Sequence, residues 1–149
     1  MCIRDRAWPV GSAPGGPCHR GWPDETRIIA VSDVYELFQR GTQLLESGDF
    51  NAATVPLARA RDLDSDKASI REALGRAYFR SAQFEAAAAE FEALAERAPT
   101  NDYALFCLGR SLLELGRPKD ARKALAVAAG LRPDRRDYRI YRDRARAAA

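Results

Sequence analysis

Three glycines recur at a constant interval along this chain. Gly41, Gly75 and Gly109 are separated from one another by 34 residues. A sequence period of about 20 to 50 residues is typical of stacked arrays, in which each copy of a small unit buries its apolar face against the next. The spacing therefore predicts three copies of one unit, over residues 34–67, 68–101 and 102–135.

Each copy contains two amphipathic stretches with helical spacing. From residue 33 onward Ala, Leu, Glu and Arg are abundant and β-branched residues are sparse, which favours helices over strands. Two-residue segments such as Gly48-Asp49 and Gly116-Arg117 separate the stretches, and short connections make consecutive helices antiparallel. The predicted fold is all-α, a solenoid of three antiparallel helix pairs, with helices over 33–47, 50–63, 67–81, 84–97, 101–115 and 118–131.

The three glycines lie inside the first helix of each predicted pair, where glycine costs about 1 kcal/mol relative to alanine. We expect close approach of the paired helices to offset this cost, with the glycines opposite Ala53, Ala87 and Ala121. Pro99 and Pro133 should end the second helices of the second and third copies. Pro56 falls within the second helix of the first copy and predicts a kink or a late helix start.

The middle copy shows the repeated pattern most completely, with Leu74-Gly75 followed by Tyr78, Ala87, Phe91 and Pro99. This order resembles the tetratricopeptide repeat, which reads W-x2-L-G-x2-Y, then A-x3-F, then P. The resemblance spans residues 34–135, and it implies a curved array whose first helices line a concave face. The departures are Leu37, Arg71 and Leu105 in place of tryptophan, Arg40 in place of the first leucine, and Ser65 in place of the first proline.

The C-terminal segment is expected to form a capping helix over residues 134–147, which closes a domain of residues 33–147. Tyr138, Tyr141 and Ala145 would form its apolar stripe, and Asp134 would cap its N-terminus. Arginines occupy the remaining positions. An array needs such a helix because its last repeat would otherwise expose an apolar face to water.

The resemblance places a partner-binding groove on the concave face. Aromatic and arginine side chains recur there in register, and this composition is typical of binding hot spots that grip carboxylates. The sequence thus predicts a non-catalytic adaptor that binds an acidic, apolar peptide or protein segment. The alternative is that the aromatic rings pack between helices and the arginines are solvated. The candidate groove residues are Tyr35, Phe38, Thr42, Leu45, Ser69, Glu72, Arg76, Phe79, Arg80, Tyr103, Phe106, Arg110 and Leu113.

Two other ligands for this surface were weighed. One groove known in the family clamps the C-terminal carboxylate of chaperone tails with lysine, asparagine and arginine, so the resemblance implies no such clamp where this chain has Phe38, Thr42, Ala73, Tyr103 and Cys107. The chain's own acidic and apolar segment, DETRIIAV at residues 24–31, is the other candidate occupant.

A different function is suggested by the arginine-rich C-terminus. Residues 132–146 hold seven arginines and three aspartates, a net charge of +4, which could attract nucleic acid or an anionic surface. The interleaved aspartates are typical of an ordinary solvated helix, so nucleic-acid binding is the secondary hypothesis.

Catalysis, metal binding and cofactor binding find no support in the sequence. The one histidine, His19, lies outside the repeats, and the three cysteines form no C-x-x-C pair. The glycine-rich residues 11–21 lack the Lys-Ser or Lys-Thr of a phosphate-binding loop, and Cys107 is expected to act in packing. The sequence contains no apolar run of membrane-spanning length, so a cytoplasmic location is expected.

The first 32 residues are expected to be a disordered lead. MCIRDR, residues 1–6, resembles a translated sequencing adapter, and residues 7–23 are rich in glycine and proline. The abundance of alanine and arginine is typical of a GC-rich bacterial genome, and the repeats resemble those of small stand-alone bacterial proteins.

Overall fold

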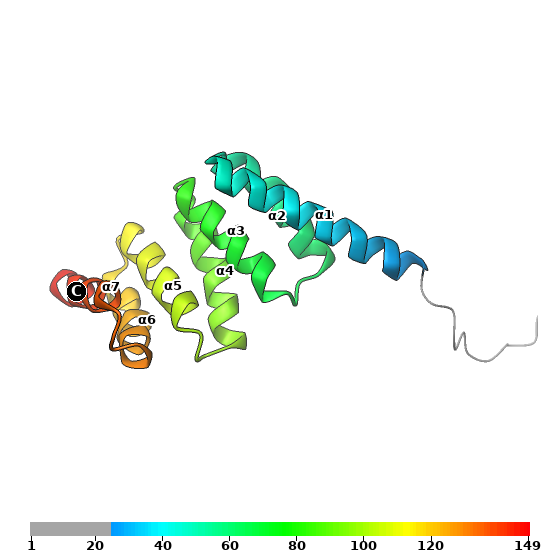
Figure 1. The fold of residues 1–149 in the computed structure, drawn as a ribbon. Helices are drawn as coiled ribbons and strands as arrows, with labels where there is room; N and C mark the ends of the chain where they lie inside the picture. Colours follow the sequence, from blue (N-terminus) through cyan, green and yellow to red (C-terminus); the bar gives the residue numbers. More distant parts are fainter. Residues whose placement is uncertain (1–24) are drawn as a thin grey trace, which may run out of the picture.

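The computed structural model describes residues 25–149, with side chains from residue 31. Within that range the chain forms seven α-helices and no strand, which confirms the all-α class (Figure 1). The helices are α1 (Glu25–Ser47), α2 (Phe50–Leu63), α3 (Ala68–Arg80), α4 (Phe84–Arg97), α5 (Asp102–Glu114), α6 (Pro118–Leu131) and α7 (Arg136–Ala148).

The helices stack in chain order. Each packs mainly on its neighbours in sequence, and α1 also touches α3 while α5 also touches α7. Figure 1 shows the resulting procession of helix pairs, with α7 at the far end from α1. This is the solenoid of three helix pairs and a terminal helix that the sequence period predicts.

The three periodic glycines lie where the two helices of a pair meet. A Cβ atom at Gly41 or Gly109 would lie 2.4 Å from the Cγ of the facing leucine, and one at Gly75 would lie 2.8 Å from the Cζ of Phe91. The expected close approach is therefore confirmed, but the partner residues were predicted wrongly. Leu57, Phe91 and Leu125 face the glycines, and the alanines four positions earlier are buried beside them.

The turns inside the pairs share one backbone conformation. Gly48 and Gly116 have φ angles of 88° and 70°, in the left-handed region where glycine ends helices. Ala82 occupies the equivalent position of the middle pair with a φ of 60°, although its side chain disfavours this region.

Three expectations about helix ends are corrected. Helix α1 begins at Glu25, so residues 25–32 of the expected lead are helical, and residues 1–24 lie outside the described range. Neither glycine nor proline interrupts the chain from Glu25 to Arg40, and this favours the longer helix. Helix α2 runs from Phe50 through Pro56, so a late start is wrong. Helix α7 begins at Arg136, and Asp134 pairs with Arg132 instead of capping it.

The apolar stripe of α7 is as expected. Tyr138 and Ala145 are fully buried and Tyr141 is half-buried. The ring of Tyr138 stacks on Phe106 with 4.3 Å between centroids, and its hydroxyl donates a 2.9 Å hydrogen bond to Oδ2 of Asp102. The terminal helix is thus anchored to α5 by both an apolar and a polar contact.

A buried ion pair joins the first two repeats. Glu90 of α4 is 5% exposed, and its carboxylate accepts hydrogen bonds from Arg61 of α2 and from Arg71 of α3. The hydrogen bond to Glu90 is the main cause that raises the pKa of Arg61. Arg71 stands where the repeat pattern has tryptophan, so in this chain a charge pair takes the place of an aromatic contact.

Candidate peptide-binding cleft

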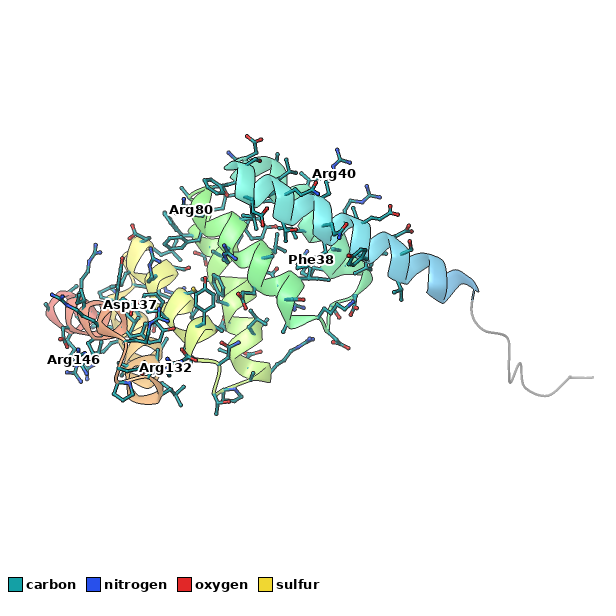
Figure 2. The ribbon with its side chains drawn as sticks, in the orientation of Figure 1. Phe38, Arg40, Arg80, Arg132, Asp137 and Arg146 are labelled. Atoms are coloured by element: carbon teal, nitrogen blue, oxygen red, sulfur yellow. The ribbon has the colours of Figure 1, made fainter. Side chains whose placement is uncertain are left out.

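A cleft of about 480 Å³ opens between the first helices of the three pairs. Its walls come from the C-terminal end of α1, the turn that follows it, and the facing sides of α3 and α5. Figure 2 labels Arg80 at the end of α3 beside that turn. The lining residues are Leu45, Glu46, Ser47, Gly48, Phe50, Arg76, Phe79, Arg80, Phe91, Tyr103, Cys107 and Arg110.

The cleft carries a positive charge. Arg76, Arg80 and Arg110 line it with one acidic residue, Glu46, so the lining has a net charge of +2. Among residues 31–149, none of these three arginines forms an ion pair. A carboxylate that enters the cleft therefore meets guanidinium groups without a competing intramolecular partner.

Aromatic rings hold two of these arginines. The guanidinium carbon of Arg80 lies 4.7 Å from the ring centroid of Phe50, and that of Arg110 lies 4.6 Å from the ring centroid of Phe79. Such cation–π contacts restrict the side chains without neutralising their charge. The Nε atom of Arg110 is buried and has no hydrogen-bond partner in the described part of the chain.

The floor of the cleft is neutral at physiological pH. Burial raises the pKa of the Cys107 thiol to about 11, while the neighbouring Tyr103 hydroxyl acts in the opposite direction to a smaller extent. Burial likewise raises the pKa of Tyr103. Both groups are protonated near pH 7, so the floor offers Phe91, a thiol and a phenol to an apolar side chain.

Half of the expected groove residues come together in this cleft. They are Leu45, Arg76, Phe79, Arg80, Tyr103 and Arg110. Ring packing, the alternative interpretation, applies to Phe106, which is 6% exposed between α5 and α7, and to Phe38, which packs toward α3 (Figure 2).

The other expected residues also lie outside the cleft lining. The Thr42 hydroxyl donates to the carbonyl oxygens of Phe38 and Gln39 in its own helix, at 3.1 and 2.9 Å. Tyr35 is 59% exposed and its hydroxyl accepts a hydrogen bond from Gln39. Ser69 is exposed, whereas Glu72 and Leu113 are half-buried.

Sequence reasoning missed the contribution of the second helices. Phe50 begins α2 and Phe91 lies in the middle of α4, yet both line the cleft. The family resemblance directs attention to first helices only, but the Gly-Asp turn at residues 48–49 is a signal that brings Phe50 close to the groove. Residues 25–31, the suggested internal occupant, form the first turns of α1 and are therefore not an extended strand in the cleft.

The described residues lack two features that would point to other functions. No helix from Glu25 onward is long and apolar enough to cross a membrane. In the same range, no three histidine, cysteine, aspartate or glutamate side chains are grouped so as to hold a metal ion.

Solved structures with a similar fold are tetratricopeptide domains. The first tetratricopeptide domain of Spaghetti (RPAP3), bound to the HSP90 peptide SRMEEVD, has a TM-score of 0.72 and 17% identity, over 78% of this chain and 93% of that one. The OM64 domain of Arabidopsis has a TM-score of 0.73 and 18% identity, over 80% and 99%. MamA of AMB-1 has a TM-score of 0.71 and 24% identity, over 76% of this chain and 62% of that one.

At the level of sequence, a comparison with curated proteins finds no match. The sequence model of the family described as "Tetratricopeptide repeat" matches residues 38–102, 72–136 and 106–149. The starts of these matches are 34 residues apart, as are the three glycines. Because the matches together cover most of the chain, it belongs to the tetratricopeptide-repeat family.

Proposed function

We propose that this chain is a non-catalytic interaction module that binds a peptide segment of a partner protein in the cleft between α1, α3 and α5. The segment combines carboxylates with apolar side chains. The observation that carries this proposal is the set of three arginines without intramolecular ion pairs around a neutral, partly aromatic floor.

The dimensions of the cleft suit such a ligand. Its volume of about 480 Å³ lies within the range of about 300 to 1,000 Å³ in which proteins bind small ligands and side chains. Arginine binds carboxylates through paired N–H groups, and each such charge-assisted contact contributes about 1.5 to 3 kcal/mol. A peptide with two suitably spaced carboxylates would therefore gain both affinity and a preferred direction.

The structural relatives support a peptide ligand and suggest a different register. The Spaghetti domain was solved with an acidic peptide of HSP90. In this chain Phe38, Thr42, Ala73, Tyr103 and Cys107 stand at the clamp positions implied by the family resemblance, and none of these side chains is cationic. Arg76, Arg80 and Arg110 would bind the carboxylates instead, so we do not propose chaperone tails as the ligand.

The experiment compares two labelled octapeptides by fluorescence anisotropy. The acidic octapeptide alternates Asp-Glu and Leu-Phe pairs, and in the neutral octapeptide Asn and Gln replace the acids. At low salt we expect the acidic octapeptide to bind at least about tenfold more tightly, since one charge-assisted contact accounts for that ratio. Equal affinities, or binding of neither peptide, would refute the proposal.

The nucleic-acid alternative gains no support from the geometry of the C-terminal arginines. Arg132, Arg135, Arg142 and Arg146 form ion pairs with the interleaved aspartates, which leaves Arg136, Arg139 and Arg144 of the seven without one among the described residues. We therefore propose the cleft, and not α7, as the primary binding site.

A further inference from the structure

Arg110 is surrounded by aromatic rings from three helices. Its guanidinium carbon lies 4.6 Å from the ring centroid of Phe79 on α3, 5.6 Å from that of Phe106 on α5, and 5.1 Å from that of Tyr141 on α7. Phe79 is part of the cleft lining, whereas Phe106 and Tyr141 are not. Tyr141 therefore contacts a cleft residue without itself facing the cleft.

The position of Tyr141 is fixed by the anchor of α7. One turn earlier, Tyr138 stacks on Phe106 and bonds to Asp102, which holds α7 against α5. The ring of Tyr141 then meets Phe106 edge-on, at 5.4 Å between centroids and an interplanar angle of 87°. The terminal helix thus delivers one ring face to the guanidinium of Arg110.

No hydrogen bond within the described chain orients the Nε atom of Arg110, which is buried and without an acceptor. The ring faces are consequently the contacts that restrict this guanidinium. They also exclude water from it, and a partly desolvated cation attracts a carboxylate more strongly than a hydrated one does.

We propose that Tyr141 is a positioning residue for the cleft: through Arg110, it sets how strongly the cleft prefers acidic peptides. Helix α7 accordingly has two roles, since it covers the last repeat and also orders a binding arginine. The effect on affinity depends on the proposed function, but the effect on Arg110 itself does not.

The first test needs no ligand. In the full-length protein labelled with ¹⁵N, the Nε–H signal of Arg110 is assigned by its loss in Arg110→Lys, and its exchange with water is measured by NMR. We expect slow exchange in the wild type and in Tyr141→Phe, which keeps the ring. In Tyr141→Leu, which keeps apolar volume without a ring face, exchange should be at least about fivefold faster. Ile140→Ala, at an exposed neighbour on α7, is the control and should leave the signal unchanged.

The second test uses the acidic and neutral octapeptides. Tyr141→Leu should weaken binding of the acidic octapeptide about fivefold, leave the neutral octapeptide unaffected, and have no effect in an Arg110→Ala background. Tyr141→Phe should restore wild-type affinity. A loss of affinity for both peptides, or a full effect in the Arg110→Ala background, would show a general packing role and overturn the proposal.

The outcomes separate the two claims. An unchanged Arg110 signal in Tyr141→Leu overturns the positioning role whatever the peptides do. If the wild type does not prefer the acidic octapeptide, the proposed function fails while the NMR result still decides whether Tyr141 orders Arg110. Circular dichroism confirms folding of each variant, and Tyr141→Met replaces Tyr141→Leu if the latter does not fold.

Discussion

The carboxylate of Glu90 accepts a 2.8 Å hydrogen bond from Nη1 of Arg71, in the column where repeats of this family carry tryptophan. A second bond from Arg61 adds the preceding repeat to the same site. The three side chains lie mostly out of solvent, at 6%, 16% and 27% exposure for Glu90, Arg71 and Arg61. The junction between the first two repeats is therefore polar, unlike the aromatic packing that surrounds Phe106.

Loss of this carboxylate should destabilise the array. Glu90→Gln leaves two partly buried guanidinium groups without a counter-charge, and we expect a decrease of about 2 kcal/mol in the free energy of unfolding. Urea denaturation followed by circular dichroism measures it. Glu92→Gln, at an exposed neighbour on the same helix, should stay within about 0.5 kcal/mol of the wild type, and equal values for the two variants would contradict the assigned role.

The helix glycines should respond to a methyl group according to their surroundings. Gly109→Ala places a Cβ atom 2.4 Å from Cγ of Leu125, so we expect it to destabilise the protein by about 1 to 3 kcal/mol through overpacking. Gly130→Ala, in α6 with no atom within 4 Å, should instead stabilise it by up to about 1 kcal/mol. Thermal unfolding compares the two, and the same sign for both changes would show that the close approach is wrongly assigned.

The turn of the middle pair offers a stabilising change. Ala82 has a φ of 60°, so Ala82→Gly relieves left-handed strain and should raise the free energy of unfolding by about 0.5 to 1 kcal/mol. The converse change, Gly116→Ala, should lower it by a similar amount because Gly116 has a φ of 70°. Thermal melts of the two variants measure both effects, and a less stable Ala82→Gly would contradict this explanation.

Charge reversal in the cleft should affect binding and not folding. The double change Arg76→Glu and Arg110→Glu should weaken binding of the acidic octapeptide by about 100-fold or more, because two attractive contacts become repulsive. Anisotropy measures the affinity and circular dichroism the helix content. Arg122→Glu, at an exposed position of α6 away from the cleft lining, is the charge control. Similar losses in this control would indicate general electrostatic attraction instead of a site.

The thiol of Cys107 should report on the cleft through its pH dependence. Its pKa of about 11 leaves on the order of one thiolate in a thousand at pH 8, and the thiolate is the reactive form. In a Cys2→Ser, Cys18→Ser background, alkylation by iodoacetamide should accelerate about tenfold per pH unit toward pH 11. The acidic octapeptide should slow the reaction by covering the cleft. A rate that levels off below pH 9 would contradict the burial of this group.

The spacing of the glycines predicted the architecture because it is a property of the whole array. Each glycine is needed wherever paired helices touch, so a period in the sequence becomes a period in space. The apolar stripe of α7 was equally legible, since Tyr138 and Ala145 obey helical spacing. Identifying the residue that faces each glycine required more, because it depends on how far the second helix is rotated about its axis.

The cleft was only half predictable for a related reason. Phe38 and Phe106 share a column with each other, and from the sequence alone both face the groove. In the structure Phe106 is covered by Tyr138 and Tyr141, which follow the last repeat and have no counterpart in the period. The contribution of Phe50 depends on the geometry of the preceding turn, which the repeat pattern does not encode.

Helix α7 also has a consequence for self-association. Unclosed repeat arrays are able to lengthen, because the bare end of one molecule matches the start of another and such head-to-tail joins propagate into filaments. Here the end is occupied by Tyr138, and the outward side of the helix presents Arg136, Arg139 and Arg144, which repel the same side of a second copy. Growth of a polymer through the C-terminal end is blocked sterically and electrostatically at once.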